Sequence, residues 1–168
     1  MKLQFLVSAV NEDVRTLAER MYLQADAIIV NQCGENAYQE YDRKGYRIQC
    51  YSFAEKGVGL SRNNCLMRAQ RELCMFADED IIYQPGAARA VTAEFEKNPS
   101  ADLILFNMDV PQERATYRIE SYGRVRWYNC GRYGAVSFAV KREKLFESGV
   151  TFSLLFGGGA KYSAGRRS

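Results

Sequence analysis

Two carboxylates one residue apart, Asp78 and Asp80, directly follow the apolar run at residues 73–77. The run is too short for a helix and entirely apolar, so it predicts a buried strand with the carboxylates at its carboxyl end. Carboxylates that face one point suit Mg²⁺ or Mn²⁺, which take oxygen ligands and complete their shell with water and substrate phosphates. A metal held in this way neutralises charge on a leaving diphosphate. A solvated acidic turn without any ligand is the alternative that these residues leave open.

A glycine turn and a helix with an arginine precede this strand. Gly57 and Gly59 allow a tight turn, and composition predicts a helix over residues 60–71. The first N–H groups of a helix are unpaired and favour anions. Arg62 adds a fixed positive charge suited to bidentate contact with a phosphate. Residues 56–80 therefore predict a nucleotide and metal site.

A series of short apolar runs and amphipathic segments must position these residues. Strands are predicted over residues 3–10, 25–30, 46–53, 101–108 and 135–140. Helices are predicted after Asn11, from a first turn at Pro85 to Lys97, and over residues 141–147. Asn11 is the predicted helix cap, with Glu12 and Asp13 in the first turn. The polar residues 37–45 are predicted to be helix or loop. This order indicates a parallel sheet with covering helices.

Asn31 and Gln32 follow the second predicted strand. Ligands of open α/β sheets bind outside the carboxyl ends of the strands, which is where these two amides are expected. The alternative, that they only close a turn, stays open.

The amino-acid composition excludes several kinds of catalytic and binding site. The chain has 168 residues, 47% of them hydrophobic, a net charge of +3 and no histidine. The length fits one domain with a real core. The missing histidine excludes Ser-His-Asp and Cys-His catalysis, so acid–base chemistry falls to carboxylates, Lys, Cys or Tyr. Dispersed basic residues and the lack of a basic-aromatic patch argue against nucleic acid as a partner.

The cysteines and the hydropathy pattern indicate a compartment. Five cysteines occur without a C-x-x-C pair, which suits free thiols in a reducing, cytoplasmic environment. The apolar run at the N-terminus is too short for a signal peptide, and no stretch approaches the ~20 apolar residues of a membrane span. Any contact with a membrane would be peripheral or through a partner.

Two motifs in the central stretch carry a family resemblance. Residues 59–63 (GLSRN), followed by a helix and then by residues 76–80 (FADED), resemble the family-2 glycosyltransferases of the GT-A fold. Residues 7–12 (VSAVNE) are similar to the first strand of that family, which usually ends in Pro-x-Tyr-Asn-Glu. The segment from Gly157 to Gly165 is similar to its glycine-rich acceptor-side segment. The resemblance covers nearly the whole chain.

The resemblance implies a fold and an activity. The fold would be a single Rossmann-like α/β GT-A domain over residues 1–168, with a mixed, mostly parallel sheet and flanking helices. The activity would be transfer of a sugar from a nucleoside diphosphate sugar to a hydroxyl, with inversion and with Mg²⁺ or Mn²⁺. The acceptor would be a saccharide or a lipid-linked molecule in polysaccharide or glycoconjugate synthesis, at the inner face of the membrane if at a membrane at all.

The resemblance also implies roles for individual residues. Asp78 would contact the nucleotide sugar and, with Asp80, the metal. The other implied donor-binding residues are Ala9, Asn11, Asn31, Gln32, Gly59 and Arg62. Asn31 and Gln32 stand where the family commonly has Asp-Asp for recognition of the base, so the identity of the base is open.

The acceptor side is implied by Gly158 and Gly159 and by aromatic residues. Trp127, with Tyr122, Tyr128 and Tyr133, offers aromatic faces that suit sugar rings. The alternative is that these aromatic side chains fill the core of the second half of the chain.

The end of the glycine-rich segment departs from the family. The family usually continues into Gly-Glu-Asp, whose carboxylate is the candidate base for the acceptor hydroxyl, whereas this sequence reads GRRS from Gly165 to Ser168. One interpretation is a C-terminally incomplete, catalytically degenerate domain that binds the nucleotide sugar without useful turnover. The other is that a different carboxylate serves as the base, which the sequence does not identify.

Overall fold

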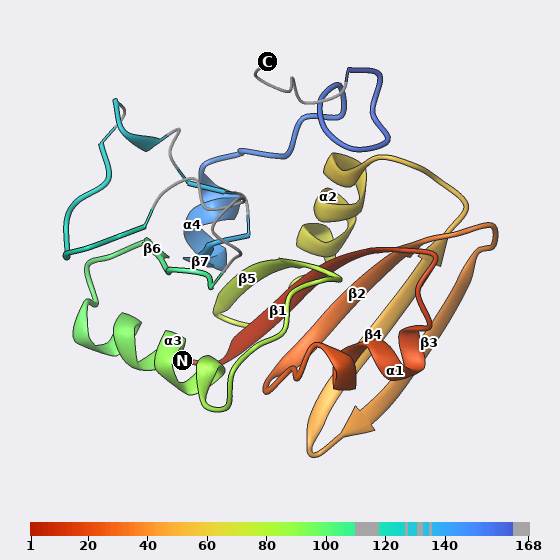
Figure 1. Cartoon of the computed structure of the whole chain (residues 1–168), viewed down its shortest axis with the longest axis horizontal. Helices are drawn as coiled ribbons and strands as arrows, with labels where there is room; N and C mark the ends of the chain where they lie inside the picture. The colour runs from red at the N-terminus through yellow and green to blue at the C-terminus, as the bar shows by residue number, and fades with distance from the viewer. Residues whose placement is uncertain (110–117, 127, 131–132, 135, 163–168) are drawn as a thin grey trace.

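The described part of the chain is built on one mixed β-sheet. The computed structural model describes residues 1–109, 118–126, 128–130, 133–134 and 136–162. The strands are β1 (Leu3–Val10), β2 (Asp26–Gln32), β3 (Ala37–Arg43), β4 (Tyr46–Phe53), β5 (Leu73–Asp78), β6 (Leu103–Leu105) and β7 (Phe138–Lys141). The helices are α1 (Val14–Arg20), α2 (Val58–Arg68), α3 (Ala87–Lys97) and α4 (Arg142–Glu147). Seven described strands lie in the order β3-β4-β2-β1-β5-β7-β6 (Figure 1).

The four strands in the middle of the sheet run parallel. β4 pairs with β2, β2 with β1, and β1 with β5, all in parallel register. β3, β7 and β6 add antiparallel pairs at the two sides. The expected mixed α/β sheet with flanking helices is therefore confirmed, and the carboxyl ends of the four parallel strands meet at one edge.

Alternating side chains of the central strands build a core on each face of the sheet. On one face, Phe5 and Val7 lie in an apolar cluster that includes buried residues of α1 and α3. On the other face, Leu6 and Phe76 lie in a cluster with Cys65 of α2. Burying apolar side chains on both faces makes the strands nearly continuous apolar runs, which is why the sequence reveals them.

The region of residues 37–45 was the main error of the sequence-based prediction. It forms the edge strand β3 and a tight turn to β4, not a helix or loop. Side chains of β3 alternate between half-buried and exposed, and the turn uses Lys44 and Gly45 at φ 55° and 82°. Only one face of this edge strand is partly covered, so its residues are mostly polar. The alternation of apolar and polar residues that identifies a strand is therefore weak in this segment.

The start of α1 also differs from the prediction. Asn11 does not cap the helix; it takes a left-handed conformation at φ 54°. The cap is Asp13, whose side chain accepts a hydrogen bond from the N–H of Arg15, and the first turn of the helix holds no acidic residue. Asn11 is thereby left in the turn that leads out of β1.

Among the remaining predicted elements, β1 and β4 have the predicted bounds and the others have shifted bounds. α2 begins at Val58, two residues before the predicted start, and β6 spans only three residues of the predicted 101–108. Residue 135, the first of the predicted last strand, lies outside the described residues, and β7 begins at Phe138. Cys33, Cys50, Cys65 and Cys74 are free thiols. None of the described helices has the length and apolar character needed to cross a membrane.

Candidate functional site

A pocket of about 310 Å³ lies where the parallel strands end. It is lined by Ser8, Ala9, Val10, Gln32, Val58, Ser61, Asp78, Glu79, Asp80 and Gly158. The sheet register explains the convergence, because Ser8 is level with Asp78 across β1 and β5, and Val10 with Gln32 across β1 and β2.

The pocket brings together five of the residues predicted for the site: Ala9, Gln32, Asp78, Asp80 and Gly158. Asn11, Asn31, Gly59, Arg62 and Gly159 are not among its lining residues. Trp127 lies outside the described residues, so its predicted acceptor-side role stays a prediction.

Asp78 is held by Arg62. The Nη2 of Arg62 lies 2.8 Å from Oδ1 and 3.1 Å from Oδ2 of the carboxylate. The Arg62 side chain is 12% exposed and that of Asp78 is 36% exposed, so the cation is the inner partner and the anion the outer one. Arg62 is not a lining residue of the pocket, and it acts on the pocket by holding the Asp78 carboxylate.

The other two carboxylates of the triplet have different surroundings. Glu79 is half-buried, and burial raises the pKa of its carboxyl, with smaller contributions from the negative charges of Asp78, Asp80 and Glu12. Asp80 is exposed, and no hydrogen bond or ion pair joins its side chain to another described residue. Asp80 therefore presents an unused carboxylate to the pocket.

The donor set suits a metal only together with a ligand. Among the described residues, no group of three or more His, Cys, Asp or Glu side chains is arranged to hold a metal ion. Asp78 and Asp80 could supply two oxygen ligands at the rim of the pocket. Mg²⁺ commonly uses one or two protein carboxylates and takes its remaining ligands from water and substrate phosphates. The residues present fit that arrangement.

The two predicted base-recognition amides are both engaged with the backbone. The Asn31 side chain accepts from the N–H of Glu12 at 3.1 Å and donates to its C=O at 2.9 Å. The Gln32 side chain accepts from the N–H of Gly57 at 3.1 Å and donates to its C=O at 3.0 Å. Asn31 therefore fixes the turn after β1, and Gln32 fixes the turn before α2, while contact with a nucleotide base stays a prediction.

Gly59 is needed because another part of the chain approaches it closely. A Cβ on Gly59 would lie 2.1 Å from the carbonyl oxygen of Ser153. The N–H of Val58, at the start of α2, donates to the C=O of Gly158 at 3.0 Å. Figure 1 shows this late segment beside the start of α2, although about a hundred residues separate the two in sequence. The glycine-rich segment is thereby brought to the edge of the pocket.

Ser8 is the main residue that the sequence analysis missed. The residue is 5% exposed, its hydroxyl has no hydrogen-bond partner among the described residues, and it lines the pocket. A period-of-two reading of β1 would have found it, since Ser8 shares a face with Leu6 and Val10, whereas Ala9 points to the other face. Val58, Ser61 and Glu79 are also lining residues outside the predicted set.

Solved structures of S. aureus TarS share this fold. The S. aureus TarS 1–349 structure matches at a TM-score of 0.71 and 15% identity, covering 98% of this chain and 52% of that chain. The same protein in complex with UDP-GlcNAc matches at a TM-score of 0.66 and 16% identity, covering 91% of this chain and 49% of that chain. A longer structure, S. aureus TarS, matches at a TM-score of 0.60 and 18% identity, covering 91% of this chain and 30% of that chain. The chain thus spans about half the length of the TarS 1–349 structures, or less for the longer one.

Sequence comparison gives the family. No curated protein matches the sequence significantly. The family described as "Glycosyl transferase family 2" matches residues 8–156, which include the end of β1, the start of α2 and the acidic triplet. Because this match covers most of the sequence, the chain belongs to glycosyl transferase family 2.

Proposed function

We propose that the pocket at the carboxyl edge of the sheet binds a nucleoside diphosphate sugar together with Mg²⁺ or Mn²⁺. The observation that supports this most is the composition of the pocket wall. Among its described lining residues three are acidic, Asp78, Glu79 and Asp80, and none is basic. A diphosphate is repelled by such a wall unless a divalent cation lies between them. The solved relative in complex with UDP-GlcNAc makes a uridine diphosphate sugar the first donor to test.

The proposed reaction transfers the sugar, with inversion, to a hydroxyl of a saccharide or lipid-linked acceptor in polysaccharide or glycoconjugate synthesis. Asp80, with its free carboxylate, would be the main metal ligand, and Asp78 would add an oxygen whose position Arg62 fixes. The metal would neutralise the charge that develops on the leaving diphosphate. Gly158, from the glycine-rich segment, would close the side of the pocket on which the acceptor enters.

A second candidate is donor binding without useful transfer. All acidic residues among the described lining residues come from the triplet that would face the metal and the diphosphate. No separate carboxylate in this set is left to take the proton of the acceptor hydroxyl. Loss of a positioned general base lowers a rate by about 10²–10⁴-fold and leaves binding in place.

Calorimetric titration tests the site. UDP and UDP-GlcNAc are titrated into the protein with Mn²⁺, with Mg²⁺ and with EDTA. We expect binding that depends on the metal and weakens by at least about 10- to 100-fold in Asp80→Ala. Glu19→Ala, which removes one exposed carboxylate from α1, is the matched control and should bind like the wild type. Metal-independent binding, or equal losses in both variants, would overturn the assignment.

Turnover separates the two candidates. Release of UDP that requires an acceptor and disappears in Asp78→Asn would support sugar transfer. Metal-dependent binding with no release of UDP for any acceptor tried would favour the binding domain.

A further inference from the structure

Phe152 is clamped to α2 by Asn63. The amide of Asn63 donates to the C=O of Phe152 at 2.9 Å, and its oxygen accepts from the N–H of Phe152 at 2.8 Å. A two-point bond of this kind fixes both the position and the direction of the backbone at residue 152. Asn63 directly follows Arg62, so the clamp lies beside the cation that holds Asp78.

The ring of Phe152 packs between the core and this cation. Its centroid lies 4.9 Å from that of Phe76 in an edge-on arrangement, and the Cζ of Arg62 lies 5.5 Å from its centroid. The guanidinium of Arg62 thus has the Phe152 ring and the Asp78 carboxylate as neighbours. Attraction between a guanidinium and an aromatic face is strengthened where water is excluded, as it is around this largely buried side chain.

Few other contacts fix the Arg62 guanidinium. Within the described part of the chain, its Nε is buried without a hydrogen-bond partner, and its polar contacts are the two to Asp78. An arginine side chain has several rotatable bonds, so one ion pair alone leaves alternative rotamers available. The orientation of Arg62, and through it that of Asp78, therefore depends on the ring of Phe152.

We propose that Asn63 and Phe152 are positioning residues for the donor pocket, acting through Arg62 on the Asp78 carboxylate. The inference rests on the proposed function, since it assigns these residues to the site that binds the nucleoside diphosphate and the metal. The same late segment that carries Phe152 contributes Gly158 to the pocket wall. Docking of residues 152–158 against α2 thus sets the acceptor-side wall and the donor-side carboxylate together.

Phe152→Leu tests the proposal. Leucine keeps an apolar contact with Phe76 but offers no aromatic face to Arg62. We expect the dissociation constant for UDP with Mn²⁺ to rise about threefold to thirtyfold, and Phe152→Tyr, which keeps the ring, to restore it. Phe138→Leu is the matched control, because the ring of Phe138 also packs on Phe76, at 5.6 Å between centroids, whereas the ring that lies beside the Arg62 guanidinium is that of Phe152. It should lower stability by a similar amount and leave affinity unchanged.

Coupling to Arg62 is tested by a double variant. If Phe152 acts through Arg62, then Phe152→Leu in an Arg62→Lys background should weaken binding by much less than it does in the wild type. The proposal would be overturned if Phe152→Leu weakened binding by the same factor in the Arg62→Lys background as in the wild type. It would also be overturned by an unchanged affinity in Phe152→Leu, or by an equal loss of affinity in Phe138→Leu.

A measurement without ligand separates this proposal from the proposed function. The NMR resonance of the Arg62 Nε–H in the ligand-free protein should shift in Phe152→Leu, because the ring current is lost, and should stay in place in Phe138→Leu. An unshifted resonance in Phe152→Leu would overturn the positioning role. Failure of the wild type to bind UDP with either metal, alongside a shifted resonance, would count against the proposed function while the contact between Phe152 and Arg62 stands.

Discussion

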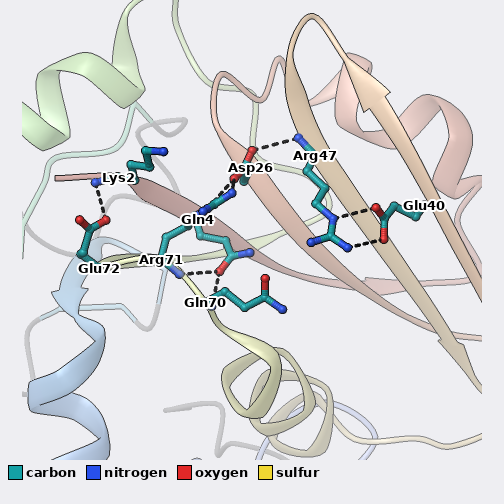
Figure 2. A network of polar contacts seen from close by, with 8 residues as sticks. All are labelled: Lys2, Gln4, Asp26, Glu40, Arg47, Gln70, Arg71 and Glu72. Carbon is teal, nitrogen blue, oxygen red and sulfur yellow. Dashed lines mark hydrogen bonds and ion pairs between the residues drawn. The ribbon is translucent and has the colours of Figure 1, made fainter.

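The carboxylates at the two ends of the parallel strands differ in whether they have partners within the protein. At the amino end, each carboxylate of the network in Figure 2 has a partner: Asp26 pairs with Arg71 at 2.5 Å, Glu40 with Arg47 at 2.7 Å, and Glu72 accepts from the N–H of Lys2 at 2.8 Å. At the carboxyl end, the described pocket lining holds three carboxylates and no cation, and only Asp78 is paired, with Arg62 behind it.

This difference separates stability from binding. Charges that are satisfied within the protein stabilise the fold and have nothing left to offer a ligand. Charges that are left without partners cost stability and are retained where binding needs them. The amino end therefore belongs to the fold, and the carboxyl end belongs to the site.

The amino end nevertheless supports the site from a distance. The Gln4 side chain accepts from the N–H groups of Gln70 and Arg71 at 2.8 and 3.3 Å. These bonds fix the connection between α2, which carries Arg62, and β5, which ends in Asp78 (Figure 2). Gln4, rather than the ion pairs beside it, thus sets the relative position of the two elements whose far ends form the pocket.

Gly59→Ala should have the largest effect and should break the carboxyl end. The new Cβ would meet the backbone oxygen of Ser153 at 2.1 Å, so residues 152–158 must move. Overpacking of this kind costs about 1–3 kcal/mol and occasionally more, against a gain of at most about 1 kcal/mol in helix propensity. We expect a lower free energy of unfolding in urea and weaker binding of UDP with Mn²⁺.

Gly158→Ala is the matched variant for stability. A Cβ at Gly158 would have no described atom within 4 Å and its φ needs no glycine, so the urea midpoint should stay unchanged. Equal midpoints for Gly59→Ala and the wild type would mean that the late segment does not dock on α2.

Asp26→Ala should damage the amino end only. It leaves the Arg71 guanidinium without its carboxylate and removes the acceptor of the Arg47 N–H, which lies 2.9 Å from Asp26. We expect a loss of about 1–3 kcal/mol in the free energy of unfolding and unchanged affinity for UDP with Mn²⁺. Asp102→Ala, at a carboxylate that is 58% exposed and 3.7 Å from Lys141, should change stability by less than about 0.5 kcal/mol. A tenfold loss of affinity in Asp26→Ala would erase the distinction between the two ends.

Ser8→Ala should stabilise the ligand-free protein. The buried Ser8 hydroxyl has no partner in the part of the chain that the structure describes, so its removal should raise the free energy of unfolding, by about 1 kcal/mol. Ser61→Ala is the counterpart of opposite sign, because the Ser61 hydroxyl donates to the C=O of Val30 at 3.4 Å. A destabilised Ser8→Ala variant would show that this hydroxyl is satisfied within the fold and would weaken the case for binding at this end.

Glu79→Gln should change how the free energy of unfolding depends on pH, because it removes one of the carboxylates at the carboxyl end. Because burial and the neighbouring carboxylates raise the pKa of Glu79 in the folded protein, ionisation of Glu79 opposes folding. Below the ordinary pKa of 4.5 both states are protonated, and the variant and the wild type should be equally stable. As the pH rises through the folded pKa, the wild type alone loses stability, so the variant should become the more stable one. A constant difference between pH 4 and pH 8, measured by urea unfolding, would contradict this.

Glu40→Gln should show the opposite pH dependence, with the smallest effect. Hydrogen bonds from Arg47 and then Tyr38 lower the pKa of Glu40 to about 2, against an ordinary value of 4.5. Its contribution is therefore present above pH 4.5 and is lost as the pH falls toward 2. The variant should be slightly less stable than the wild type at pH 7, and the gap should close in acid. A gap that widens in acid would remove the contrast between the two ends.

The core strands could be predicted because a strand that is buried on both faces consists of consecutive apolar residues, as at residues 73–77. β3 could not, because an edge strand with exposed alternate residues has no such run. Asn31 and Gln32 were correctly expected at the end of a strand, but their bonds to Glu12 and Gly57 depend on segments that are distant in sequence.

The sequence by itself determined which chemical groups the site can use: the acidic triplet, Arg62, and glycines where a chain must turn or be approached. Each of these is a local property of composition and spacing. Only the tertiary structure decided that Arg62 faces Asp78, that Ser8 is left without a partner, and that Phe152 lies beside Arg62. Those facts depend on the register of β1 against β5 and on a late segment packing onto α2, and contacts between distant segments leave no periodic signal in the chain.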